Sequence, residues 1–314
     1  MKTSLLRAAL ACVAIGASVP LAAAPGASDP MRANRTALFD LVRFNGGFLA
    51  VGERGAILRS DDECANWHGQ TTPTMRTLVS VAVVDKNVSV AVGHGGTIVR
   101  SADGGQTWQA VKAEDASSDS ILGVAALSDG RLVAWGAYGL YLESFDQGVK
   151  WARKSVVSDD FESHISKVLE VRSRLYLVGE GGTIAVSEDR GETWKKLASP
   201  YQGSFFGLLE LKDGSLLAYG MRGNVFRSHD GGASWDKVPF DSKSALNGGT
   251  VAADSRVILV GNNGLIAVSR DNGRSFELRT SPEGTPVAKA DYANDGALVY
   301  VGYLAAGRLN QQGQ

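Results

Sequence analysis

Residues 92–108 read Val-Gly-His-Gly-Gly-Thr-Ile-Val-Arg-Ser-Ala-Asp-Gly-Gly-Gln-Thr-Trp, and this stretch decides the fold because the chain repeats it. Five relatives and a degraded seventh copy share one marker glycine, and these glycines are Gly52, Gly93, Gly136, Gly179, Gly220, Gly261 and Gly302. Their spacings are 41, 43, 43, 41, 41 and 41 residues. A regular period of this size indicates a repeat architecture such as a propeller.

Each period holds four short segments with strand character. In the second copy they are residues 77–84, 88–92, 97–101 and 108–112, which are rich in Val, Ile, Thr and aromatic side chains. The Gly-x-x-Gly element between the second and third segments suits a tight hairpin with positive φ. Four antiparallel strands per period are typical of a propeller blade. We therefore expect an all-β, seven-bladed β-propeller with four-stranded antiparallel blades.

The last period is incomplete. It supplies strand-like segments at residues 287–291 and 297–301 and a weak one at 308–311, but no outer strand. Because a propeller must protect its sheet edges, we expect residues 28–36 to complete this blade. The N-terminal segment would then close the ring.

The third and fourth segments of each copy are joined by Ser-x-Asp-x-Gly-x-Thr-Trp, which is complete at residues 101–108 and 187–194. This is the Asp-box of the BNR repeat family. Its aspartate can accept backbone N–H bonds across the turn, and its aromatic residue can pack between neighbouring sheets. The six aspartates are Asp62, Asp103, Asp146, Asp189, Asp230 and Asp271.

These aspartates invite a catalytic or calcium-binding interpretation, which their spacing opposes. One carboxylate per blade cannot meet another at a single substrate, and each loop lacks the further acidic ligands of a calcium site. The four histidines also lack metal-ligand spacing, and Cys64 stands where other copies have glycine. We therefore expect no catalytic residue, no metal site and no cofactor.

Residues 1–27 have the features of a cleaved signal peptide: Lys2 and Arg7, an apolar run and then small residues. The residues before Cys12 do not form a lipid-attachment pattern, so we expect a periplasmic or secreted protein that is not a lipoprotein. Residues 28–314 would form one propeller domain. Cys64 is then the only cysteine left, which rules out an internal disulfide.

The charge balance restricts the class of partner. Without Lys2 and Arg7, 30 basic residues face 33 acidic ones, and no basic run stands out. Nucleic acid is therefore not expected as a partner, because such binding relies on clustered Lys and Arg. No apolar stretch after the signal peptide approaches a membrane span, so stable membrane insertion is not expected either.

The Gly-x-x-Gly turns share one face of the predicted ring with the connections between blades. Their glycines repeat, but the residues between them differ in charge and size, which maintenance of the fold does not explain. Solvated turn tips are the alternative interpretation. A varied ring of this kind around a propeller mouth is a plausible surface for binding a protein segment. The candidate binding residues are Glu53, Arg54, His94, Tyr138, Glu180, Arg222 and Asn262.

The repeat unit Val-Gly-x-x-Gly-Thr-Ile-x-x-Ser-x-Asp-Gly-Gly-x-Thr-Trp closely resembles that of the photosystem II stability/assembly factor family, over residues 37–303. The resemblance implies a seven-bladed propeller on the lumenal or periplasmic side that binds a membrane-protein precursor without catalysis. Some relatives in non-photosynthetic bacteria occur beside large export permeases. The family's arginine patch cannot be matched residue by residue here, and the lipid-attachment cysteine of its cyanobacterial members is absent.

Two hypotheses of different classes follow. The first is a monomeric, exported scaffold that binds a membrane-protein complex or its precursor and is not an enzyme. The second is a carbohydrate-active Asp-box protein, either a sialidase-like glycoside hydrolase or a lectin. Sialidases of this type carry an Arg-Ile-Pro motif, whereas none of the eight prolines here follows an isoleucine. A glycosidase would also need two carboxylates about 5–10 Å apart in one cleft.

Overall fold

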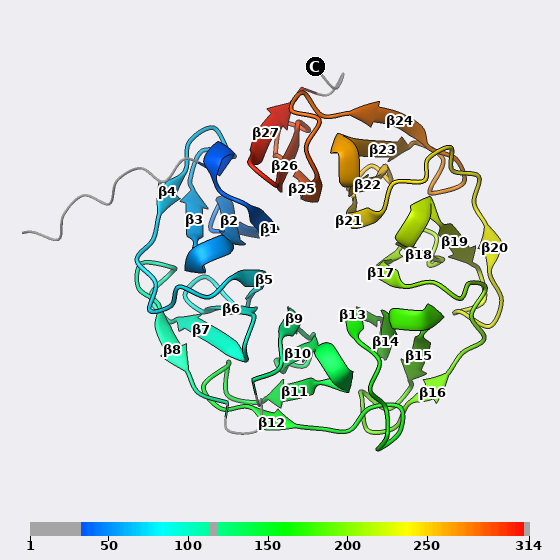
Figure 1. Cartoon of the computed structure of the whole chain (residues 1–314), viewed down its shortest axis with the longest axis horizontal. Helices are drawn as coiled ribbons and strands as arrows, with labels where there is room; N and C mark the ends of the chain where they lie inside the picture. Colours follow the sequence, from blue (N-terminus) through cyan, green and yellow to red (C-terminus); the bar gives the residue numbers. More distant parts are fainter. Residues whose placement is uncertain (1–32, 114–117, 311–314) are drawn as a thin grey trace, which may run out of the picture.

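The computed structural model describes residues 33–113 and 118–310 of the chain. The predicted signal peptide, and residues 28–32 of the predicted closing segment, lie outside the described residues. Seven small antiparallel sheets are arranged radially around a central axis, as Figure 1 shows. The seven-bladed all-β propeller expected from the repeat is thus confirmed. No helix in the described parts is long and apolar enough to cross a membrane.

The first four blades run in sequence order from the innermost to the outermost strand. Their strands are β1 (Leu38–Phe44), β2 (Gly47–Gly52), β3 (Ile57–Ser60) and β4 (His68–Gly69); β5 (Leu78–Val83), β6 (Ser89–Gly93), β7 (Thr97–Ser101) and β8 (Gln109–Val111); β9 (Ile121–Ala126), β10 (Leu132–Gly136), β11 (Tyr141–Ser144) and β12 (Ala152–Arg153); β13 (Ile165–Val171), β14 (Arg174–Gly179), β15 (Ile184–Ser187) and β16 (Lys195–Lys196).

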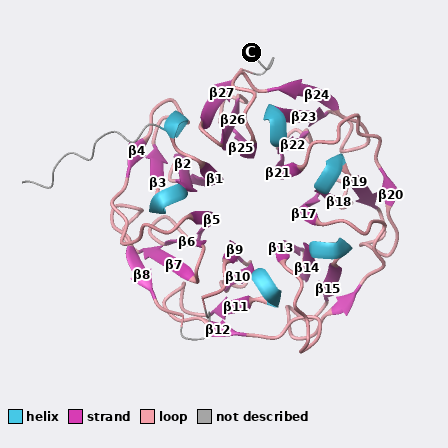
Figure 2. Cartoon of the chain, viewed as in Figure 1, coloured by secondary structure: helices cyan, strands magenta, loops and turns pink. Residues whose placement is uncertain are grey.

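The last three blades follow the same order. Their strands are β17 (Phe205–Glu210), β18 (Leu216–Gly220), β19 (Val225–Ser228) and β20 (Asp236–Lys237); β21 (Leu246–Val251), β22 (Val257–Gly261), β23 (Leu265–Ser269) and β24 (Glu277–Thr280); β25 (Val287–Tyr292), β26 (Leu298–Gly302) and β27 (Ala305–Leu309). Short 3-10 turns join the second and third strands of five blades, and Figure 2 shows them spaced around the ring: η2 (Glu53–Gly55), η3 (Ala137–Gly139), η4 (Glu180–Gly182), η5 (Met221–Gly223) and η6 (Asn262–Gly264).

Ring closure differs in detail from the expectation. Within the described residues, the seventh blade has three strands, and its third strand begins at Ala305 rather than at residue 308. The described part of the closing segment is not a strand but the 3-10 turn η1 (Ala33–Arg35), which lies beside β27. Ala33 is buried with side chains of both the first and the seventh blade. The N-terminal segment therefore does join the two ends of the ring, through side-chain packing.

The aromatic residue of each Asp-box packs between its own blade and the blade before it. Trp151 of the third blade, for example, lies in a buried cluster with Val90 of the second blade and Leu132 of the third. The same arrangement holds for Trp67, Trp108, Trp194, Trp235 and Phe276. Each aromatic ring therefore acts as a wedge that links consecutive sheets.

Removal of one wedge should destabilise the whole ring. Trp151 is 6% exposed and its indole N–H donates to the Gly148 carbonyl at 3.1 Å. The substitution Trp151→Ala should lower the free energy of unfolding by about 3–5 kcal/mol, because it leaves a cavity between two sheets. Urea denaturation followed by circular dichroism measures this loss. Val149→Ala, at an exposed side chain of the same loop, is the control, and an equal loss there would contradict the wedge role.

Candidate functional site

The Gly-x-x-Gly turns, the Tyr303-Leu304 turn and the linkers that enter the innermost strands form one surface, which we call the turn face. In all seven blades the first residue of the turn donates its backbone N–H to a linker carbonyl, at 2.9–3.0 Å. In the first blade the Glu53 N–H donates to the Ala37 carbonyl, at 2.9 Å. Each turn is thus fixed to the entrance of the innermost strand of its blade.

The marker glycines are required by this close approach. A Cβ atom added at Gly52 would lie 2.2 Å from the Ala37 oxygen, and one at Gly93 would lie 2.0 Å from the Thr77 oxygen. The second glycine meets a linker in the same way, since a Cβ at Gly55 would lie 2.0 Å from the Thr74 oxygen. The repeated glycines therefore serve the fold, as expected, and leave the residues between them free to differ.

The second residue between the glycines has a left-handed backbone conformation. Its φ is 54° at Arg54, 52° at Tyr138 and 58° at Arg222. Non-glycine residues rarely adopt this conformation, which here is held by the hydrogen bond from the turn to the linker. The structure thus fixes the direction in which these three side chains leave the surface.

The candidate binding residues all lie on the turn face, but one or two per blade rather than as one cluster. All are exposed except Glu53, which is half-buried and accepts the Ala37 N–H at 3.1 Å. The structure brings Tyr138 and Glu180 together through His164, whose ring packs edge-on against Tyr138 at 4.9 Å and whose Nδ1 lies 3.5 Å from the Glu180 carboxylate. His164 was not among the candidates because its linker position follows no repeat.

Sequence reasoning also missed a ring of side chains on the innermost strands, around the central axis. The innermost strand of every blade has a β-bulge at its second residue, where the register shifts by one. A bulge redirects a side chain, and each bulge residue is partly or fully exposed at the turn-face end of its strand. We call this ring the collar; its residues are Phe39, Val79, Leu122, Ser166, Phe206, Asn247 and Ala288.

In three blades the residue after the collar residue is charged: Asp40, Lys167 and Lys289. Asp40 is engaged with the second blade, since it accepts the Ser80 hydroxyl at 2.9 Å and the Val81 N–H at 3.0 Å. Burial, and then the nearby Lys289 ammonium, lower the pKa of Lys167 to about 8, although Asp40 opposes this shift. An anionic neighbour would therefore stabilise the charged form of Lys167.

Exposed apolar side chains gather on the turn face. Of eight large hydrophobic residues that are exposed in the described parts of the chain, six lie there: Phe39, Met75, Tyr138, Met221, Tyr303 and Leu304. The other two, Phe145 and Val149, belong to the Asp-box loop of the third blade on the opposite face. The exposed apolar side chains therefore lie mainly on one face, distributed over the first, third, fifth and seventh blades and the linker before β5.

The Asp-box carboxylates, in contrast, are used inside their own loops. In the fourth blade Asp189 accepts the Ser187 hydroxyl at 2.7 Å and the Thr193 N–H at 2.8 Å, while the Ser187 oxygen accepts the Gly191 N–H at 2.6 Å. The equivalent three bonds occur in all six boxes at 2.6–2.9 Å. The boxes therefore stabilise turns, as their spacing indicated.

These hydrogen bonds make stability depend on acid pH. The Thr193 hydroxyl, then its N–H, lowers the pKa of Asp189 to about 2, and Ser234 acts likewise on Asp230. Because the folded pKa lies below the unfolded value of about 3.9, the contribution is complete above about pH 5 and is lost as pH falls towards 2. The double variant Asp189→Asn/Asp230→Asn should therefore show a weaker fall in melting temperature between pH 5 and 2.

The control for this pH dependence is the double variant Asp236→Asn/Asp241→Asn, which removes two exposed aspartates outside the boxes. Its melting temperature should follow the wild-type pH profile more closely. Identical profiles for the box variant and the wild-type protein would show that the boxes contribute nothing to acid stability.

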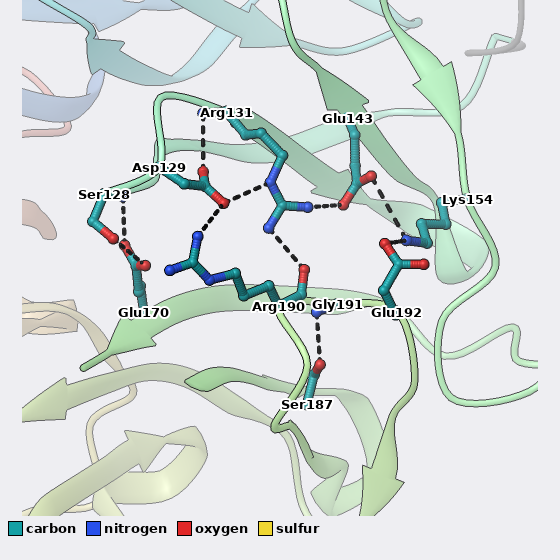
Figure 3. Close-up of polar contacts among 10 residues, drawn as sticks. All are labelled: Ser128, Asp129, Arg131, Glu143, Lys154, Glu170, Ser187, Arg190, Gly191 and Glu192. Carbon is teal, nitrogen blue, oxygen red and sulfur yellow. Dashed lines mark hydrogen bonds and ion pairs between the residues drawn. The ribbon is translucent and has the colours of Figure 1, made fainter. Parts of the chain in front are cut away.

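Asp129, Glu143 and Glu192 belong to a charge network between the third and fourth blades (Figure 3). Arg131, which is buried, donates to Glu143 at 3.0 Å, to Asp129 at 3.0 Å and to the Arg190 carbonyl at 2.8 Å. Lys154 joins Glu143 to Glu192 of the fourth-blade box, at 3.8 and 2.8 Å. The network thus neutralises Asp129 and Glu143 and links two blades.

Loss of the Arg131 guanidinium should destabilise the fold, because it leaves the buried Glu143 carboxylate without this partner. Burial already raises the pKa of Glu143 above its ordinary value, although Lys154 and Arg131 oppose this. The substitution Arg131→Met should lower the unfolding free energy by about 3–5 kcal/mol, and Arg131→Met/Glu143→Leu should recover most of it. Arg174→Met, which breaks the exposed Arg174–Glu188 pair, should cost less than about 1 kcal/mol. No recovery in the double variant would contradict the pairing.

One constellation resembles a nucleophile and its base. The Ser215 hydroxyl lies 3.1 Å from His229 Nδ1, but His229 Nε2 lies 2.6 Å from the Arg227 guanidinium. Because arginine can only donate, Nε2 must accept and Nδ1 must carry the proton. His229 therefore donates to Ser215 and cannot take its proton. Burial also raises the pKa of the Cys64 thiol to about 12, which makes Cys64 a poor nucleophile.

Comparison with known proteins agrees with the propeller fold. The family model described as "Photosynthesis system II assembly factor YCF48" matches residues 59–235, more than half of the chain. No curated protein matches the sequence. Metal-ligating side chains do not gather anywhere in residues 33–113 or 118–310.

Solved structures with the same fold include YCF48 bound to D1 peptide, which is 16% identical over 85% of this chain and 89% of that chain, with a TM-score of 0.71. YCF48 from Cyanidioschyzon merolae is 14% identical over 87% and 94% of the two chains, with a TM-score of 0.69. A streptogramin B lyase is 11% identical over 90% and 94%, with a TM-score of 0.75. At these identities the likenesses show the fold alone. On the family match over residues 59–235, and in agreement with the repeat, the chain belongs to the YCF48 photosystem II assembly factor family of BNR-type β-propellers.

Proposed function

We propose that this protein is an exported, non-catalytic β-propeller that binds a segment of another protein on its turn face. It would act as an assembly or accessory factor for a membrane-protein complex or its precursor. The observation that carries the proposal is the concentration of exposed apolar side chains on that face. Export rests on the signal-peptide features of residues 1–27.

The turn face suits a polypeptide because it combines apolar and polar groups on a rigid frame. The collar offers Phe39, Leu122 and Phe206 at the turn-face ends of the innermost strands, and Arg54, Glu180 and Arg222 add charges on the turns. The hydrogen bonds from turn to linker hold these groups before a partner arrives, which reduces the entropy lost on binding.

Family membership supports a protein as the partner, and a relative has been solved with a peptide bound. The membrane-protein complex is inferred from the family's description as an assembly factor. An export permease would be the corresponding client in a non-photosynthetic bacterium. We do not propose the carbohydrate-active alternative, because the box carboxylates are held one per blade and the Asp129–Glu143 pair is neutralised by Arg131.

The charges on the turn face provide a test. The double variant Arg54→Glu/Arg222→Glu should abolish capture of partner proteins from solubilised membranes, because both side chains are exposed and point away from fixed turns. Its melting temperature should stay within about 2 °C of the wild-type value, since neither side chain supports the fold. Co-purifying proteins are quantified by mass spectrometry.

The matched control is Lys195→Glu/Lys237→Glu, which makes the same change of charge on the outermost strands β16 and β20. Capture should be unaffected there. Equal capture by the wild-type protein and the turn-face variant would reject the turn face as the binding site.

A further inference from the structure

The seventh blade breaks the pattern of aromatic wedges. Its sequence carries no Asp-box, so no box aromatic stands between the sixth and seventh blades. At this interface the structure has a cavity of about 40 Å³ that opens into a surface groove. A cavity large enough for one water needs about 10–15 Å³, so this one has room for the end of a side chain.

The cavity occupies the place of a missing wedge. It is lined by Ile258 of the sixth blade and Leu298 of the seventh. These residues stand three and four positions before their marker glycines, as Val90 and Leu132 do in the cluster that holds Trp151. The same two repeat positions that contact an internal tryptophan elsewhere therefore face an open cavity here.

Three arginines surround the groove: Arg256, Arg270 and Arg279. Arg256 pairs with Asp254 at 2.7 Å and stacks over the Tyr292 ring at 4.4 Å, and Arg279 lies 3.8 Å from Glu277. Arg270 is exposed and forms no hydrogen bond or ion pair with another described residue. The groove therefore combines an apolar floor with one positive charge that is not neutralised.

The N-terminal turn η1 packs away from the groove. Ala33 of the N-terminal turn packs in the cluster on the first-blade side of the seventh sheet, whereas the cavity lies on its sixth-blade side. Within the described residues, β27 pairs only with β26, so its outer edge lies beside the groove without the fourth strand of other blades.

We infer that the groove is a docking site for an extended segment of a partner protein that carries an aromatic residue next to a carboxylate. The aromatic ring replaces the missing wedge, the carboxylate meets Arg270, and the backbone pairs with β27 as an added strand. This site lies away from the turn face and does not rest on the function proposed for that face.

A synthetic peptide tests this inference with the full-length chain. The probe is an eight-residue peptide with one tryptophan flanked by glutamates in a Thr/Val background. It should shift the methyl NMR signals of Ile258 and Ile266, which line the cavity, in a saturable manner. A version with alanine in place of tryptophan should cause no shift.

Variants of the protein then separate the contribution of charge to peptide binding from the contribution of cavity shape. Arg270→Glu should weaken binding about five-fold or more and should bind a lysine-flanked version of the peptide better than the wild-type protein does. Leu298→Phe should block the cavity. Arg54→Glu/Arg222→Glu should bind the probe normally, so failure of the turn-face proposal and failure of this one are distinguishable.

Three results would overturn the inference. One is the absence of any shift at Ile258 and Ile266, and another is binding that neither Arg270→Glu nor Leu298→Phe alters. The third is a shift of the same signals caused by Met31→Ser without peptide, because the cavity would then belong to the chain's own N-terminal residues.

Discussion

Each sheet of this ring depends on burial of both of its faces against neighbouring sheets. The second strand of a blade shows this most directly, since β6, β10 and β22 are buried along their whole length. A single blade would expose these apolar runs to water on both sides, so the blades are stable only as a closed set. The box aromatics fill six of the seven interfaces between blades, and the serine–aspartate hydrogen bonds position those aromatics. Local turn chemistry and ring closure are therefore coupled.

The same coupling separates the residues that maintain the fold from those available for binding. Gly52 and its equivalents let a linker carbonyl approach to a distance that no side chain would permit. Since a backbone hydrogen bond holds each turn to its linker, the side chains of Arg54, Tyr138 and Arg222 are not required for this contact. The fold can therefore present a different set of side chains in each blade on an unchanged frame, which is what a surface specific for an irregular partner segment requires.

Most of the fold could be predicted from the sequence because it depends on repeated local signals. The marker glycines gave the number of blades, and the strands of the second blade agree with the expected segments to within one or two residues. Features that depend on contacts between blades could not be predicted. Phe39 is exposed through a bulge that has no sequence signature, and Arg131 meets Glu143 and the fourth-blade box only in three dimensions. Residues 28–36 were expected to complete the last blade because its edge needs protection, and in the described part of this segment Ala33 joins the two ends of the ring through side-chain packing.

A ring of six complete repeats and one shortened repeat can keep an incomplete interface because the cost is small. At about 24 cal/mol per Å³, a cavity of about 40 Å³ corresponds to about 1 kcal/mol. That is well below the 3–5 kcal/mol expected for excising a wedge from an interface built around it, because Tyr292, Leu298 and Leu309 already occupy much of the space. The seventh blade therefore sacrifices little stability by lacking an Asp-box. At the other interfaces the chain's own box aromatic fills the wedge position. At this one interface the wedge position stays accessible.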